Sequence, residues 1–176
     1  MTTTTREIEQ LACSEALDRL TDTLQQAIAQ GRLEQPLMVG IHTGGLVVAR
    51  ELHRRLGLES PLGELDISFY RDDFTRIGLH PQVKPSRLPF ELDDCHLILV
   101  DDVLHTGRTI RAAMNELFDY GRPARIHLAV LVERPGRQLP IEAQSVGLSL
   151  DLAKGQYVKL VIDDVAGLHL SVQERQ

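Results

Sequence analysis

The fold is decided by one stretch of sequence, Leu97-Ile98-Leu99-Val100-Asp101-Asp102-Val103-Leu104-His105-Thr106-Gly107-Arg108-Thr109. The four apolar residues that open it predict a strand buried on both faces. Two carboxylates follow at once, and after the polar residues the apolar spacing over residues 110–118 predicts a helix. A strand, a short polar loop and a helix in this order indicate a parallel α/β sheet, which binds ligands outside the carboxyl ends of its strands.

The polar residues of this stretch fall into two halves with different chemistry. Residues 106–109 offer backbone N–H groups, two hydroxyls and a helix N-terminus, which together suit a phosphate. Asp101 and Asp102 offer only acceptors, which suit sugar hydroxyls or a hydrated Mg²⁺. A ligand with a phosphate at one end and a metal-bound diol at the other would satisfy both halves.

Several interpretations of the stretch compete. An ordinary strand that ends in a helix cap is disfavoured, because two adjacent carboxylates at a buried strand end are costly without a partner. A P-loop ATPase also has a strand that ends in two Asp residues, but Leu46 and Val47 follow residues 40–45 where its glycine loop needs Lys and Ser or Thr. A receiver domain carries its acidic pair near the N-terminus and lacks the Thr-Gly-Arg-Thr tail. The remaining interpretation is that residues 100–109 resemble, without a gap, the phosphoribosyl-diphosphate (PRPP) motif of type I phosphoribosyltransferases.

The resemblance extends beyond the motif. Segments 63–73, 121–123, 128–132 and 137–141 occur in the order and spacing of the PyrR family, the pyrimidine operon regulators with uracil phosphoribosyltransferase activity. The match runs from about residue 37 to about residue 162. It implies an α/β fold with a central, mainly parallel sheet flanked by helices, a small hood and a flexible lid loop at about residues 72–91. It also implies an enzyme that makes UMP and diphosphate from uracil and PRPP with Mg²⁺.

The same resemblance implies which residues form the site. Asp101 and Asp102 are expected to be catalytic and to hold Mg²⁺ through water, and Arg71 is expected to reach the pyrophosphate. PRPP is expected to contact the whole motif: Val100, Asp101, Asp102, Val103, Leu104, His105, Thr106, Gly107, Arg108 and Thr109. Weaker candidates for the base site are Val132, Arg134 and Arg137.

A second strand, loop and helix is predicted at residues 37–56. In the resembled family this loop holds the pyrophosphate, which points to His42, Thr43, Gly44 and Gly45. Relatives commonly have Lys-Thr-Arg-Gly here, so this chain lacks an arginine and has His in place of Lys. An arginine restored at Gly44 is expected to tighten PRPP binding, provided that the backbone there accepts a side chain.

The remaining elements follow from apolar periodicity. A helix is predicted from Ser14 as N-cap to Gly31, with an apolar stripe of Leu17, Leu20, Leu24 and Ile28. Strands are predicted at residues 65–69, 126–132 and, as the last one, 158–162, which Asp163 and Asp164 would close. The whole chain, residues 1–176, is expected to be one domain.

Composition and charge limit the expected location of the protein and the partners it can bind. The apolar share of 43% is ordinary, and no run approaches the ~18 apolar residues of a membrane span. Residues 1–7 lack the apolar core of a secretory signal, so a cytoplasmic location with Cys13 and Cys95 reduced is expected. The net charge of −6 disfavours nonspecific nucleic-acid binding, although a local arginine-rich patch is compatible with it.

Two other functions remain open from the sequence. One is a UMP-sensing, RNA-binding transcription attenuator that acts on the leader mRNA of a pyrimidine operon and retains only vestigial transferase activity. The other is a type I phosphoribosyltransferase that takes a purine or orotate. The resemblance to the PyrR family also implies a homodimer or higher homo-oligomer.

Overall fold

The structure is a computed structural model that describes residues 6–8, 10–67, 86–163 and 167–174. Its centre is a parallel sheet with the strand order β3-β2-β4-β5-β6. These strands are β2 (Leu37–Ile41), β3 (Gly63–Leu65), β4 (His96–Leu104), β5 (Arg125–Glu133) and β6 (Ser145–Ser149). A smaller antiparallel sheet, the hood, has the order β1-β8-β7 and consists of β1 (Arg6–Ile8), β7 (Gln156–Asp163) and β8 (Gly167–Glu174). The predicted parallel sheet and hood are confirmed.

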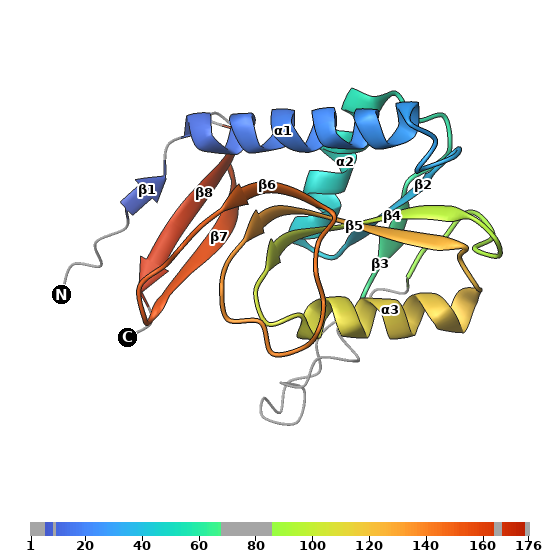
Figure 1. Cartoon of the computed structure of the whole chain (residues 1–176). Helices are drawn as coiled ribbons and strands as arrows, with labels where there is room; N and C mark the ends of the chain where they lie inside the picture. Colours follow the sequence, from blue (N-terminus) through green and yellow to red (C-terminus); the bar gives the residue numbers. More distant parts are fainter. Residues whose placement is uncertain (1–5, 9, 68–85, 164–166, 175–176) are drawn as a thin grey trace.

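Helices cover both faces of the central sheet. Figure 1 shows α1 (Gln10–Ala29) and α2 (Gly44–Leu56) on one face and α3 (Arg108–Tyr120) on the other. Along β4, Ile98 and Val100 pack with α1 and α2, whereas Leu97 and Leu99 pack with α3. All four side chains are fully buried, which explains why this strand reads as a continuous apolar run. None of the described helices is both long and apolar enough to cross a membrane.

The connections reverse direction between β2 and β4. These two strands are hydrogen-bonded neighbours, with Val39 opposite Leu99. From β2 the chain crosses through α2 to β3 on one side, and from β4 it crosses through α3 to β5 on the other side. The loops that leave β2 and β4 therefore diverge at the carboxyl ends of the two strands. Such a switch point is where open α/β sheets bind ligands, in the crevice between the diverging loops.

Two elements are longer than predicted. Helix α1 begins at Gln10 and not after Ser14, and the fully buried Cys13 extends its apolar stripe by one turn. Strand β4 does not end at Val100 but continues to Leu104, because its backbone still pairs with that of β5 beyond the carboxylates. Asp101 lies opposite Val130 in this register. The acidic pair is therefore part of a strand and not of the loop that follows it.

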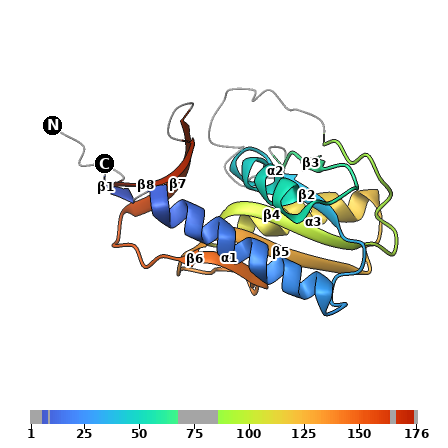
Figure 2. The same ribbon diagram turned by 90° about the horizontal axis from the view of Figure 1, so that it is seen from above.

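The chain also contains strands that the apolar pattern did not predict. Strand β6 adds the edge of the central sheet, and β8 follows β7, so the strand at residues 158–162 is not the last one. Strand β8 pairs with both β7 and β1, which brings the two ends of the chain into one sheet. Figure 2 shows α1 running from this hood across the central sheet.

The segment after residue 85 is fastened to the edge strand. Arg87 and Glu64 exchange backbone hydrogen bonds of 2.7 and 2.8 Å. The Ser86 hydroxyl accepts a hydrogen bond from the backbone N–H of Asp66 and donates one to Glu116, both at 3.1 Å. Of the lid predicted at about residues 72–91, residues 72–85 lie outside the described residues, and Ser86 and Arg87 are anchored in this way.

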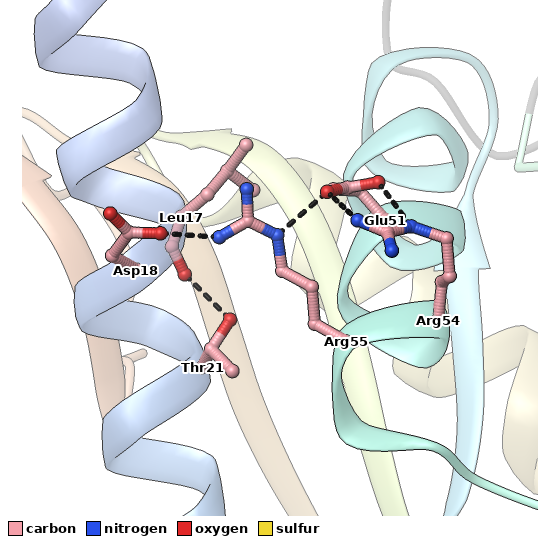
Figure 3. A network of polar contacts seen from close by, with 6 residues as sticks. All are labelled: Leu17, Asp18, Thr21, Glu51, Arg54 and Arg55. Carbon is pink, nitrogen blue, oxygen red and sulfur yellow. Dashed lines mark hydrogen bonds and ion pairs between the residues drawn. The ribbon is translucent and has the colours of Figure 1, made fainter.

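Charged side chains link the two helices that share a face of the sheet. Figure 3 shows Arg55 of α2 between Asp18 of α1, 2.5 Å from Nη1 to Oδ1, and Glu51, 2.6 Å from Nε to Oε1. Hydrogen bonds from Arg54 and then Arg55 hold the pKa of Glu51 below its ordinary value. Because Asp18 is 63% exposed, its ion pair fixes the orientation of the helices more than it stabilises them.

We expect one buried histidine to make folding stability depend on pH. His127 is 7% exposed and its Nε2 lies 2.8 Å from the Ser145 hydroxyl. Burial, and then the charges of Arg32 and Arg125, lower the pKa of His127 from 6.5. Above the pKa of His127 in the unfolded state, its contribution to stability is fully present. Below that pKa the unfolded state binds a proton that the folded state does not bind, so the free energy of unfolding falls.

The variant His127→Gln should flatten this decline. Urea unfolding at pH 7.5 and 5.5 would measure it, and wild type should lose more stability than the variant between the two pH values. Arg32→Gln should flatten the decline only in part, because it removes a lesser cause. Equal losses in wild type and His127→Gln would show that His127 is not responsible.

Candidate functional site

The crevice between β2 and β4 is bordered by two loops that each lead into a helix. Residues 42–43 connect β2 to α2, which begins at Gly44, and residues 105–107 connect β4 to α3, which begins at Arg108. A helix N-terminus carries a partial positive charge and unpaired N–H groups, so each loop can hold an anion. The Thr43 hydroxyl is exposed and makes no capping hydrogen bond. It is therefore available to a ligand.

Two adjacent glycines allow the first loop to lie on the end of β4. A Cβ at Gly45 would stand 2.6 Å from the carbonyl oxygen of Val100 and 2.8 Å from the Cα of Asp101. A Cβ at Gly44 would stand 2.1 Å from Oδ2 of Asp102. Neither glycine has a positive φ angle, so lack of space and not backbone conformation requires them. The predicted pyrophosphate loop and the predicted acidic pair therefore lie directly against each other.

The same contact limits what can stand at position 44. A side chain there would need the space in which this chain places the Asp102 carboxylate. The backbone at Gly44 accepts a side chain, as the expectation for a restored arginine required, but any such side chain must first displace Asp102.

The two carboxylates of the pair have different surroundings. Asp101 is 4% exposed, and its Oδ1 accepts a hydrogen bond of 3.0 Å from the backbone N–H of Asp102. Asp102 is half-buried; its Oδ1 accepts the N–H of Val103 at 3.0 Å, and its Oδ2 faces Gly44. Among the described side chains no cation forms an ion pair with Asp102. The pair fits Mg²⁺, which commonly takes one or two carboxylates and completes its shell with water and substrate phosphates.

The second loop turns sharply from the strand into α3. Gly107 has φ +89°, which L side chains rarely adopt, and a Cβ there would stand 3.3 Å from Ile141. The Thr106 hydroxyl accepts a hydrogen bond of 3.3 Å from the backbone N–H of Arg108. This turn brings the N-terminus of α3 to the edge of the sheet beside the acidic pair.

The segment after β5 supports the second loop from outside, and we call residues 134–139 the brace. Its backbone N–H groups donate to the carbonyl of Leu104 (3.0 Å, from Arg134) and to that of Thr106 (2.9 Å from Gln138 and 3.2 Å from Leu139). The guanidinium of Arg137 donates to the carbonyl of His105 and pairs with Glu133. These carbonyls are turned toward the brace, so their oxygens do not face an anion in the loop.

The imidazole of the first loop is held by a neighbouring strand. His42 Nε2 lies 3.2 Å from Oε2 of Glu64 on β3, and Oε1 of Glu64 lies 3.5 Å from Nη2 of Arg50 on α2. The backbone N–H of His42 donates to Leu65 at 2.9 Å. Glu64 thus fixes the position of the imidazole.

The remaining predicted residues lie around the same crevice. Val132 is buried at the end of β5, directly opposite Val103 in the register of the sheet. In the described structure Arg134 Nε is buried without a hydrogen-bond partner, and Arg137 is bound to the second loop. Contact of these three residues with a base stays a prediction. Arg71 lies outside the described residues.

Sequence reasoning did not find Glu64, Glu133 or Gln138. Glu64 occupies a strand position with ordinary alternation, and its contact with His42 depends on the pairing of β2 with β3. Glu133 and Gln138 both follow the strand predicted at residues 126–132, where no periodic pattern indicates which loop they meet. The signal for each of them exists only in the tertiary structure.

Comparison with known proteins identifies the family. Residues 8–165 match the family described as phosphoribosyl transferase domain. A protein of Pseudomonas paraeruginosa named Bifunctional protein PyrR is 58% identical over 148 residues, which cover 84% of this chain and 87% of that protein. One of the same name from Nitrosococcus oceani is 57% identical over 156 residues, 88% of this chain and 87% of that protein. The chain belongs to the PyrR family.

Solved structures confirm the fold that the PyrR family membership implies. A purine phosphoribosyltransferase from Pyrococcus horikoshii is 24% identical, with a TM-score of 0.60 over 81% of this chain and 85% of that chain. A hypoxanthine-guanine phosphoribosyltransferase from Leishmania tarentolae, in complex with GMP, is 14% identical, with a TM-score of 0.67 over 99% and 98%. The predicted type I phosphoribosyltransferase fold is therefore confirmed at low sequence identity.

The two glycines of the first loop should respond differently to alanine. At Gly45 the added Cβ meets the backbone of β4, so Gly45→Ala should lower both the melting temperature and PRPP-dependent transfer. At Gly44 the three nearest atoms all belong to the Asp102 side chain, whose carboxylate can rotate away. Gly44→Ala should therefore keep a melting temperature close to wild type but lose transfer. Equal effects of the two variants on stability would contradict this geometry.

Proposed function

We propose that this chain transfers the phosphoribosyl group of PRPP to uracil, giving UMP and diphosphate. The observation that carries the proposal is one pair of carboxylates between two loops that each open a helix, at the switch point of a parallel sheet. PRPP has the matching layout, with a 5′-phosphate, a ribose diol and a pyrophosphate in sequence. The PyrR relatives, whose names call them bifunctional, agree with a transferase that has a second role.

Each part of PRPP is assigned to residues of matching chemistry. The 5′-phosphate lies against the backbone N–H groups and hydroxyls of residues 106–109, at the N-terminus of α3. The ribose hydroxyls lie at Asp101 and Asp102, directly or through water bound to Mg²⁺. The pyrophosphate lies at residues 42–45, at the N-terminus of α2. Arg71 remains a prediction from sequence for a further pyrophosphate contact.

The reaction requires charge stabilisation and orientation, and no nucleophilic side chain. The bond from the anomeric carbon to the pyrophosphate oxygen breaks, the bond to N1 of uracil forms, and N1 gives up its proton. Positive charge develops on the ribose ring beside Asp101 and Asp102, whose negative charge stabilises it. Mg²⁺, when bound, supplies positive charge to the leaving pyrophosphate. Orientation of the two substrates alone can contribute up to ~7–11 kcal/mol.

The choice of base is proposed to be made around the end of β5. Val132, whose side chain is buried, pairs with Val103 at the carboxyl end of β5, and Arg134 follows at the start of the brace. The direct experiment is a PRPP-dependent assay with a panel of bases: uracil, orotate, hypoxanthine, guanine and adenine. Transfer to uracil with at least ten-fold higher kcat/KM than to the others is the expected result. Preference for a purine or orotate would overturn the uracil assignment.

The second role is proposed to be regulation of pyrimidine gene expression in response to UMP, through the leader mRNA of a pyrimidine operon and in a homodimer or higher oligomer. UMP shares its 5′-phosphate and ribose with PRPP and fits the same loops. A gel shift with leader RNA, with and without UMP and at several salt concentrations, tests this role. Because the net charge is −6, binding that is independent of UMP and of RNA sequence is not expected.

Removing both carboxylate charges should abolish transfer and spare the fold. In Asp101→Asn with Asp102→Asn, amide oxygens can still accept the backbone hydrogen bonds, but the charge that stabilises the ribose cation is gone. We expect kcat/KM for PRPP to fall by roughly 10²–10³-fold or more, with an unchanged circular dichroism spectrum and a melting temperature no lower than that of wild type. Near wild-type turnover would contradict the assignment.

A further inference from the structure

We propose that Arg137 is a positioning residue for the second loop: it ties the His105 carbonyl to Glu133 and thereby aims the N–H groups of residues 106–109 at the 5′-phosphate. The inference rests on the proposed function, since it names what the loop binds. It gives Arg137 a role in phosphate binding, which differs from the base contact expected from its place in the sequence.

The contacts of Arg137 join three pieces of chain. Its Nη1 donates to the carbonyl of His105, and its Nη2 pairs with Oε1 of Glu133 at the end of β5. The side chains of Arg137 and Glu133 are 24% and 28% exposed, so both are largely withdrawn from water. The planar guanidinium makes both bonds at once in a fixed geometry, which a lysine cannot do.

A glycine brings the arginine to this place. Gly136 has φ +111°, and a Cβ on it would stand 2.7 Å from Nε2 of His105. The chain at this point thus passes directly against the His105 ring and then turns. This close passage sets the backbone of Arg137 within reach of the His105 carbonyl.

The neighbouring carbonyls show what is special about His105. Those of Leu104 and Thr106 accept hydrogen bonds from backbone N–H groups of the brace, which no substitution short of proline can remove. In the described structure, the bond from the brace to the His105 carbonyl comes from a side chain. Loss of Arg137 therefore removes the bond by which the brace orients this one carbonyl, and its oxygen is no longer held away from the phosphate.

The charge of Arg137 is balanced by Glu133, so its effect on a phosphate is one of orientation more than of direct attraction. A rotated peptide would present a carbonyl dipole to the anion in place of an N–H group. This change should weaken binding of the 5′-phosphate. It should not affect binding of a pyrophosphate in the first loop or of a base at the end of β5.

The test measures each part of the substrate separately. Calorimetry with ribose 5-phosphate, pyrophosphate and PRPP, each with Mg²⁺, is combined with steady-state kinetics on the full chain. The variants are Arg137→Gln and Arg137→Lys, with Arg122→Gln as the matched control. Arg122 is exposed, and within the described structure its side chain contacts only Phe118, near the end of α3.

We expect Arg137→Gln to weaken the binding of ribose 5-phosphate and of PRPP by the same factor. That factor is about ten-fold, for the loss of one hydrogen bond to a loop peptide. Pyrophosphate affinity, the KM for uracil at saturating PRPP and the melting temperature should stay within two-fold or a few degrees of wild type. Arg137→Lys should recover part of the loss, and Arg122→Gln should show none.

Two results would overturn the inference. A raised KM for uracil with unchanged ribose 5-phosphate affinity would show that Arg137 contacts the base. If the affinities for all ligands fall equally and the melting temperature also falls, Arg137 has only a structural role. If wild type transfers to no base but Arg137→Gln still loses ribose 5-phosphate binding, the proposed function fails while the positioning role stands.

Discussion

The site depends on one close contact, the passage of Gly45 over the carbonyl of Val100 and the Cα of Asp101. This contact needs a residue without a side chain, and it sets the N-terminus of α2 directly against the end of β4. Without it the first loop would stand away from the carboxylates, and two separate anion sites would replace one continuous site. The parallel pairing of β2 with β4 and the divergence of their helices create the crevice, and the glycine closes the distance across it.

The second loop reaches comparable rigidity by other means. Its shape is determined by Gly107, which alone tolerates the φ of the turn, and by a segment that lies about thirty residues later in the chain. Every carbonyl from Leu104 to Thr106 is occupied by that segment. A loop with its acceptors satisfied on the outside presents donors on the inside, and this is the arrangement that an anion requires before it arrives.

Much of the fold could be predicted because its strands are buried on both faces. Residues 37–41 and 97–100 are apolar without interruption, and the predicted bounds of β2 match the structure. Beyond Val100 the prediction stopped too early, because Asp101 and Asp102 end the apolar run although backbone pairing with β5 continues. Strand β8 alternates Leu168, Leu170 and Val172 with polar residues, a pattern that could have been recognised.

The site was predictable in its parts but not in its supports. The acidic pair and both loops carry residue types whose chemistry can be recognised from the sequence alone. Glu64 and Glu133 are ordinary acidic residues until strand pairing and a loop bring them to His42 and Arg137. The apolar periodicity of a sequence indicates which side chains are buried, but not which polar groups contact one another. Residues whose role is to position other residues therefore cannot be predicted from it.

The pairing of β1 with β8 also has a consequence for how the chain is made. On the ribosome β1 emerges well before its partner β8, which ends at Glu174, so the hood cannot close until more than 150 residues have followed β1. Helix α1 waits as well, because the strands it covers, β5, β6 and β8, all follow it by about a hundred residues or more. Until those strands are made, only α2 can cover part of its apolar stripe, so the exposed remainder can bind other apolar surfaces during translation.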